Sequence, residues 1–286
     1  MFGSFTRSWQ ITKLTFKIMN KDKRLFLFPI FSAIFSTLFV ISMMLPSIIL
    51  PGITTNSVGS AGISFLLIFG LYFGLAFIAT FFNVGVVYII KNILEEKKPT
   101  FKESMKFAIS KIVLIIGWSL ISATVGLLLR ILDEIAERVG GIGEIFIKIL
   151  TSMIGGLWSF ITIFVIPVMV YENTGPFKAI SKSATTFKKT WGESVIKTAG
   201  LGIVQILFII LGIAATIFGL VLFAPLGGIV TMIFVILMAI YFVFILCFFS
   251  VANNIYNTAL YVYAETGNIP LGYDESITHS FEKKKE

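Results

Sequence analysis

The sequence has 286 residues, of which 57% are hydrophobic and 13% are charged, and its mean hydropathy is +0.95. Soluble domains carry ~25% charged residues, so this composition excludes an ordinary water-soluble fold. One cysteine and one histidine exclude a disulfide framework and a Cys/His metal site. The net charge of +8 is divided among gaps between hydrophobic runs, which favours anionic lipid over nucleic acid as the partner.

Six membrane spans are predicted along the chain. No charged side chain occurs in residues 25–90 or 198–264, and apolar runs longer than ~18 residues are typical of helices that cross a bilayer. Prolines and glycines near residues 46–52 and 224–228 divide each of these runs into two. Because ~20 residues cross the hydrocarbon core, we expect spans at about 25–50, 62–94, 112–129, 149–171, 198–223 and 229–263. Residues 131–148 are expected to form a short amphipathic helix on the outer surface.

The basic residues lie in alternate segments between these spans. Of the 23 Lys and Arg residues, 20 fall in the segments before spans one, three and five and in the tail. Short cytoplasmic loops carry the excess of Lys and Arg in membrane proteins. We therefore expect a multi-pass protein of the plasma membrane with both termini in the cytoplasm. No cleaved signal peptide is expected, because the polar lead is too long.

Each basic segment before a span is predicted to form an amphipathic helix at the inner membrane surface. One such helix follows Pro99, and the clearest follows Pro176. After Pro176, apolar side chains recur at spacings of three and four and so share one helical face, with lysines opposite. The apolar set is Phe177, Ile180, Ala184, Phe187 and Trp191, and the lysines are Lys178, Lys182 and Lys189. Trp9 has the corresponding place in the N-terminal segment.

Three internal repeats are predicted, each an interfacial helix followed by a transmembrane hairpin. The even-numbered spans end alike, with Glu96 before Pro99, Glu172 before Pro176 and Glu265 before Pro270. Residues 81–84 (FFNV) also resemble residues 248–251 (FFSV). We expect one membrane domain at 1–270, with repeats at 1–98, 99–175 and 176–270 and a polar tail at 271–286. The alternative is that every cytoplasmic loop needs lysine and proline, whatever its origin.

A polar stripe lies near the inner end of the last span. Its members are Ser250, Asn253, Asn254, Asn257 and Tyr261, and Asn83 occupies the position that matches Ser250. The spacing of i, i+3, i+4, i+7 and i+11 places the five residues on one helical face. Unpaired polar groups are costly in hydrocarbon. Hydrogen bonding between helices is the favoured interpretation, and a polar groove for a lipid headgroup or small solute is the alternative.

No catalytic arrangement is evident. No Asp or Glu lies within a predicted span, and the sequence has no HExxH, no G-x-S-x-G and no glycine-rich phosphate loop. The acids of residues 131–148 can pair with nearby arginines at helical spacing. We therefore expect no enzymatic activity, no cofactor and no metal. Transport coupled to protons or sodium is also disfavoured, because no carboxylate or lysine is evident in the membrane-embedded part of a predicted span.

Both ends of the chain resemble a prokaryotic integral membrane family of unknown function. The matching residues are Gly3-Ser4-Phe5, Ser8-Trp9, Asp22-Lys23 and Phe28-Pro29, then Asn257, Ala259-Leu260-Tyr261, Tyr263-Ala264, Gly267 and Pro270. The chain is more distantly similar to the membrane domain of some glycerophosphodiester phosphodiesterases, without a counterpart of their catalytic domain. The resemblance implies an all-α integral membrane fold with six spans, and it implies no catalytic residue.

The predicted function is that of a non-catalytic membrane protein that interacts with lipids or acts as a scaffold. The expected partners are membrane lipids, especially those of the anionic inner leaflet, and a second copy or other membrane proteins. The alternative is a channel or facilitator for a small solute or lipid. The surroundings of the polar stripe separate these hypotheses, since dry packing favours the first and a water-filled cavity favours the second.

The predicted topology determines from which side of the membrane two serines, Ser57 and Ser280, can be labelled. In a Cys247→Ser background, Ser57→Cys should react with an impermeant thiol reagent on intact cells, because its loop carries no Lys or Arg. Ser280→Cys, in the lysine-containing tail, should react only after the membrane is opened. Labelling of both positions from the same side would contradict six spans with both termini inside.

Overall fold

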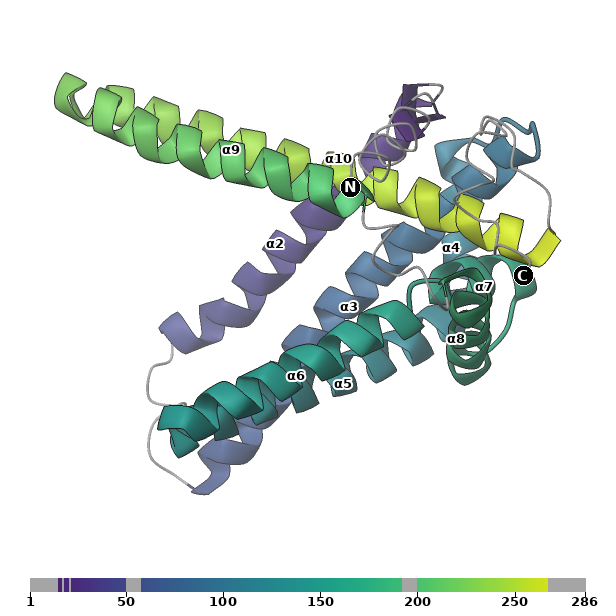
Figure 1. Ribbon diagram of the computed structural model, residues 1–286, viewed down its shortest axis with the longest axis horizontal. Coiled ribbons are helices and arrows are strands. Elements are labelled where there is room, and N and C mark those ends of the chain that lie inside the picture. The colour runs from purple at the N-terminus through teal and green to yellow at the C-terminus, as the bar shows by residue number, and fades with distance from the viewer. Residues whose placement is uncertain (1–14, 17, 21, 50–57, 192–199, 267–286) are drawn as a thin grey trace, which may run out of the picture. The chain divides into compact units, whose positions relative to one another are not determined.

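The computed structural model describes residues 15–16, 18–20, 22–49, 58–191 and 200–266, and within these ranges it contains helices and no strands. The elements are η1 (Lys23–Phe26), α2 (Leu27–Ile49), α3 (Val58–Leu94), α4 (Phe101–Ser110), α5 (Ile112–Val139), α6 (Gly141–Ile161), α7 (Val165–Glu172), α8 (Pro176–Trp191), α9 (Gly200–Phe223), η4 (Ala224–Leu226) and α10 (Gly228–Thr266). The all-helical fold class is thereby confirmed (Figure 1).

Six of the described helical segments are long and apolar enough to cross a membrane. They are Lys23–Leu45, Phe65–Leu94, Ile112–Val139, Gly141–Glu172, Val204–Leu226 and Gly228–Thr266. Each overlaps one of the six spans expected from the sequence. Segments of this length and composition indicate a multi-pass membrane protein.

The third and fourth spans differ from their predicted boundaries. Helix α5 continues past residue 129 to Val139, and α6 already begins at Gly141, so residues 131–148 form no separate surface helix. The charges there do not end a helix, because they pair along it: Arg130 with Glu134 at 3.0 Å, and Lys148 with Glu144 at 2.7 Å. The chain turns instead at Gly140, whose φ of 65° is readily adopted only without a side chain.

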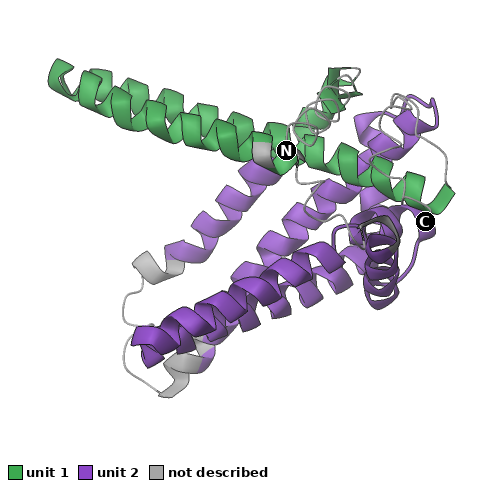
Figure 2. Ribbon diagram, in the orientation of Figure 1, with its two compact units in different colours: residues 1–29, 190–286 green, residues 30–189 purple. Residues whose placement is uncertain are grey.

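The chain divides into two compact units, residues 1–29 with 190–286 (unit 1) and residues 30–189 (unit 2), shown in Figure 2. We call the end of a helix that adjoins one of the basic segments before spans one, three and five, or the tail, its basic end. Buried side chains concentrate at these basic ends, whereas the opposite halves of α2, α9 and α10 expose large apolar side chains. Lipid tails are as apolar as leucine, so such exposure is expected in a bilayer.

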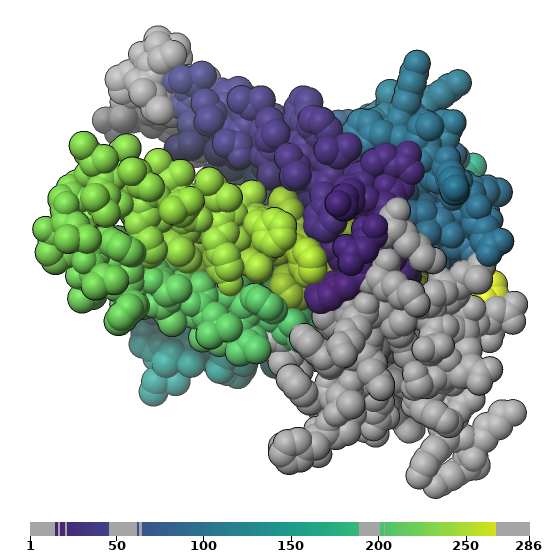
Figure 3. Space-filling view, turned by 90° about the horizontal axis from the view of Figure 1, so that it is seen from above, coloured from purple at the N-terminus to yellow at the C-terminus, as the bar shows by residue number. Residues whose placement is uncertain are grey.

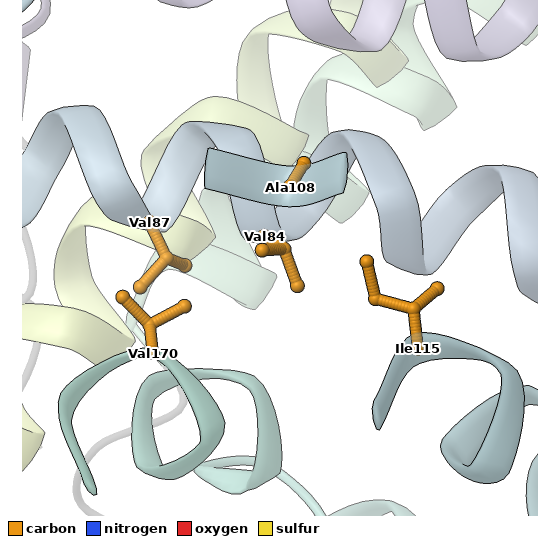
Figure 4. Packing of buried hydrophobic residues seen from close by; sticks show 5 residues of the cluster. All are labelled: Val84, Val87, Ala108, Ile115 and Val170. Carbon is orange, nitrogen blue, oxygen red and sulfur yellow. The ribbon is translucent and has the colours of Figure 1, made fainter. Parts of the chain in front are cut away.

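The core of unit 2 surrounds the basic end of α3, which packs against α4, α5 and α7. Val84 and Val87 of α3 cluster with Ala108, Ile115 and Val170, one from each of these three helices (Figure 4). Helix α4 begins with a reciprocal capping box, in which Thr100 and Glu103 satisfy each other's backbone N–H groups. Helix α2 meets α3 through aromatic rings, Phe31 and Phe35 against Phe82.

In unit 1, α10 lies beside α9 along the length of α9, and their side chains meet without a visible gap in Figure 3. Their close approach depends on glycines, because the rings of Tyr241 and Phe242 occupy the space where a Cβ of Gly212 would be. The hydroxyl of Tyr241 donates to the carbonyl oxygen of Phe208 at 2.9 Å, which fixes its ring. At the basic end, the ring of Phe16 contacts Phe248 with centroids 4.7 Å apart.

A methyl group at Gly212 should therefore destabilise the packing of α9 on α10. Gly212→Ala forces the anchored Tyr241 ring to move, and overpacking of this kind costs about 1–3 kcal/mol. The measurement is thermal unfolding of the purified protein in detergent. Gly202→Ala is the matched control, because, apart from the adjoining residues and the backbone of the same helix, no described atom lies within 4 Å of the place that its Cβ would take. Equal stability of the two variants would contradict glycine-dependent packing.

Candidate functional site

A break in the fourth span creates the docking site for α8. Pro167 has no backbone N–H, and its ring would clash with the carbonyl group four residues earlier, at Ile163. Helix α6 accordingly ends at Ile161, and α7 restarts at Val165. The single helix predicted at 149–171 is therefore wrong at this point. Around the break, the N–H of Val165 donates to Thr162 instead of Ile161, and that of Ile163 donates to Phe160.

Two of the backbone groups that lose their usual helical partners at this break are satisfied by one hydroxyl. The Ser183 hydroxyl of α8 donates to the carbonyl oxygen of Ile161 at 2.6 Å and accepts from the N–H of Phe164 at 3.0 Å. Ser183 and Phe164 are fully buried. Backbone groups cut off from water need partners of this kind. Ser183 therefore connects α8 to the kinked span.

Helix α8 has three faces, one more than the sequence analysis recognised. Ala179, Ser183 and Thr186 are buried and recur at spacings of four and three, so small side chains form the docking face. The predicted apolar face lies beside it and stays partly open, with Phe177 78% exposed and Ile180 and Ala184 half-buried. The lysines lie on the remaining face. Sequence reasoning missed the docking face because small polar residues add little to a hydrophobic pattern.

Charged and aromatic side chains of unit 2 cluster around the C-terminal end of α7. Lys182 of α8 lies 3.4 Å from the Glu172 carboxylate, and the Lys111 ammonium donates to the Asn173 side chain at 2.6 Å. The Lys91 ammonium lies 4.5 Å from the ring centroid of Tyr171, within the range of a cation–π contact. Cations near a helix C-terminus are favoured by its dipole, so these contacts stabilise the end of α7.

Beyond the end of α3, Lys97 donates a hydrogen bond to Glu95 at 2.7 Å, and this bond raises the pKa of Lys97. The pair is solvent-exposed, and surface ion pairs contribute little to stability. Among the residues that the structure describes, no three His, Cys, Asp or Glu side chains are grouped so as to hold a metal ion.

The polar stripe of Ser250, Asn253, Asn254, Asn257 and Tyr261 lies on the basic half of α10, in unit 1. The first four of these are half-buried, and Tyr261 is buried. Two hydrogen bonds stay within the helix: Asn254 donates to the Ser250 carbonyl at 2.9 Å, and Thr258 donates to the Asn254 carbonyl at 2.7 Å.

Several predicted site residues are not brought together within one unit. Asn83 is half-buried on α3 in unit 2, so its pairing with the stripe in unit 1 stays a prediction. On α8, the Phe187 ring stacks on Phe160 of α6 with centroids 5.6 Å apart. Trp9 lies outside the described residues, and so do the side chains of Lys189 and Trp191.

Comparison with known families agrees with the resemblance inferred from the sequence. A family of unknown function, DUF6159, matches residues 62–271, from the start of α3 to just past α10. The chain belongs to this family. Comparison with curated proteins gives no match. Membership in DUF6159 assigns no activity, and the similarity to phosphodiesterase membrane domains stays a prediction.

Removal of the Ser183 hydroxyl should destabilise unit 2. In Ser183→Ala, the buried Ile161 carbonyl and Phe164 N–H lose the partner that bridges them, at a cost of about 1–3 kcal/mol. Thermal unfolding in detergent measures this loss. Ser181→Ala, an exposed position on the same helix, is the matched control and should leave stability unchanged. A Ser183→Ala variant as stable as the control would show that the bridge contributes nothing.

Proposed function

We propose that this chain is a non-catalytic, multi-pass protein of the prokaryotic plasma membrane that interacts with lipids or acts as a scaffold. Three transmembrane hairpins cross the bilayer, both termini face the cytoplasm, and amphipathic helices bind the inner leaflet. The observation that carries this proposal is the way α8 is attached. It docks through its small-residue face, and its apolar face and part of its lysine face stay open.

The open apolar face of α8 continues a lipid-facing surface. Helix α6 exposes apolar side chains along one face, from Ile142 to Phe160. Phe187 of α8 stacks on Phe160, the last residue of that face. Since α6 belongs to the segment Gly141–Glu172, which is apolar and long enough to cross a membrane, its exposed face contacts acyl chains. The apolar face of α8 then reaches the same hydrocarbon at the inner boundary.

The lysine face of α8 supplies the electrostatic part of lipid binding. Lys178 on this face is exposed, and so is Lys188, which lies beside the apolar face; within the described part of the chain neither forms an ion pair. Each free lysine near an anionic leaflet contributes about 1 kcal/mol to binding. Lys182 is paired with Glu172, so it contributes less. This division supports a preference for anionic lipids that depends mainly on Lys178 and Lys188.

The depth of α8 in the membrane tests the proposal. In a Cys247→Ser background, Phe177→Cys and Thr185→Cys are each labelled with an environment-sensitive fluorophore, and the full chain is reconstituted into anionic vesicles. Both positions are exposed, so labelling should leave the fold intact. A fluorophore at 177 should be quenched by spin-labelled lipid and protected from aqueous iodide.

The fluorophore at Thr185 is the matched control, because this residue lies on the lysine face, about two helical turns from Phe177. It should be quenched by iodide and not by the spin-labelled lipid. If position 177 is as accessible to iodide as position 185, α8 does not lie at the membrane boundary, and the lipid-binding proposal loses its main support.

A further inference from the structure

The polar stripe is the open side of an otherwise enclosed helix. From Ser250 to Leu260, the residues on the other faces of α10 are buried, among them Val251, Ala252, Ile255, Ala259 and Leu260. Ser250, Asn253, Asn254 and Asn257 alone in this stretch keep partial exposure. A stripe that served only to pack one helix on another would be expected on a closed face.

Two carboxamides on this open side have unused hydrogen-bonding capacity. The side chains of Asn253 and Asn257, one helical turn apart, make no hydrogen bond to any residue that the structure describes. A carboxamide offers two N–H donors and an oxygen acceptor. The neighbouring Asn254 differs, because its amide donates to the Ser250 carbonyl.

The stripe lies where α10 leaves the hydrocarbon. Residues 229–246 expose apolar side chains and extend over about 27 Å at ~1.5 Å per residue, close to the ~30 Å of a bilayer core. Burial begins at Ile245 and Cys247, and the stripe begins about one turn after Cys247, at headgroup level. On the same helical face, toward the bilayer, Leu246 and Val243 are 54% and 53% exposed. A molecule on this face thus meets polar groups at one end and apolar side chains along the rest.

The chemistry of the stripe selects the headgroup. Residues 229–264 carry no charged side chain, whereas phosphate sites usually recruit Arg or Lys. Asn side chains both donate and accept, which complements hydroxyl groups that also do both. We propose that the stripe binds the uncharged, hydroxyl-bearing headgroup of a glycolipid from the inner leaflet, with the acyl chain along Leu246 and Val243. This proposal rests on the membrane function proposed above and names a lipid class for a second site.

Native mass spectrometry of the full chain tests this inference. The detergent-solubilised protein is offered an equimolar mixture of monoglucosyl-diacylglycerol, phosphatidylglycerol and phosphatidylcholine. The wild type should retain the glucolipid above phosphatidylcholine. Asn253→Leu/Asn257→Leu should reduce that retention about tenfold, as expected for the loss of two hydrogen bonds. The single variants Asn253→Ala and Asn257→Ala, each expected to show a smaller loss, replace the double variant if it does not fold.

Two control variants separate this site from other effects. Asn92→Leu removes a carboxamide from α3, outside the stripe, and should leave glucolipid retention unchanged. Lys178→Gln/Lys188→Gln should lower phosphatidylglycerol retention alone. If this variant retains as much phosphatidylglycerol as the wild type, the result counts against the lipid-binding role of α8 and not against the glycolipid site at the stripe.

Three outcomes would overturn the glycolipid site. The first is a wild type that retains the glucolipid no better than phosphatidylcholine. The second is unchanged retention in the stripe variants at unchanged thermal stability, which would assign the stripe to packing. The third is displacement of the glucolipid by free methyl glucoside at comparable concentration, which would show that the stripe binds a soluble sugar and that the acyl chain is not part of the site.

Discussion

The structure depends on the absence of water from hydrocarbon, which forces every backbone group in the bilayer to find its partner within the helix. Because lipid tails solvate apolar side chains as well as a protein core does, no hydrophobic force draws the spans together there. The halves of α2, α9 and α10 away from their basic ends accordingly expose their large apolar residues. Side-chain burial concentrates at the basic ends, where helices leave the hydrocarbon and where water again makes apolar burial favourable.

The same constraint explains the contact between α8 and the kinked fourth span. Pro167 releases backbone groups at a level where water is scarce, and a break there is tolerated only if the protein supplies new partners. The Ser183 hydroxyl does so with both of its functions, one as donor and one as acceptor. The docking face thus has to be small and polar, and the larger apolar side chains of α8 are left for the neighbouring face. Fixed in this way, α8 keeps its apolar face partly open.

Sequence reasoning identified the six spans because charge is costly in hydrocarbon, so charge-free runs correspond closely to α2, α3, α9 and α10. It misplaced the ends of the third and fourth spans because it treated charges as helix ends. Arg130 and Lys148 pair along their helices instead, and the positive φ of Gly140 sets the turn. Ser183 was missed because hydropathy does not detect a hydroxyl that serves backbone groups. Pro167 within a predicted span was the available signal, since a proline there requires a partner from elsewhere.

The similarity of residues 81–84 and 248–251 extends to their surroundings. Phe82 and Phe249 are buried, as are Val84 and Val251, while Asn83 and Ser250 are half-buried. Each set lies where a long helix passes from exposed to buried surface, so similar residues occupy a similar physical position. The amphipathic helices are less alike, because α4 buries Ala108 in the core of unit 2, whereas α8 leaves its predicted apolar face partly open. If the three predicted units share an origin, the transition from exposed to buried surface is the feature they have kept. The helices beside it then differ in how they pack, α4 against α3 and α8 through its small-residue face against the kinked fourth span.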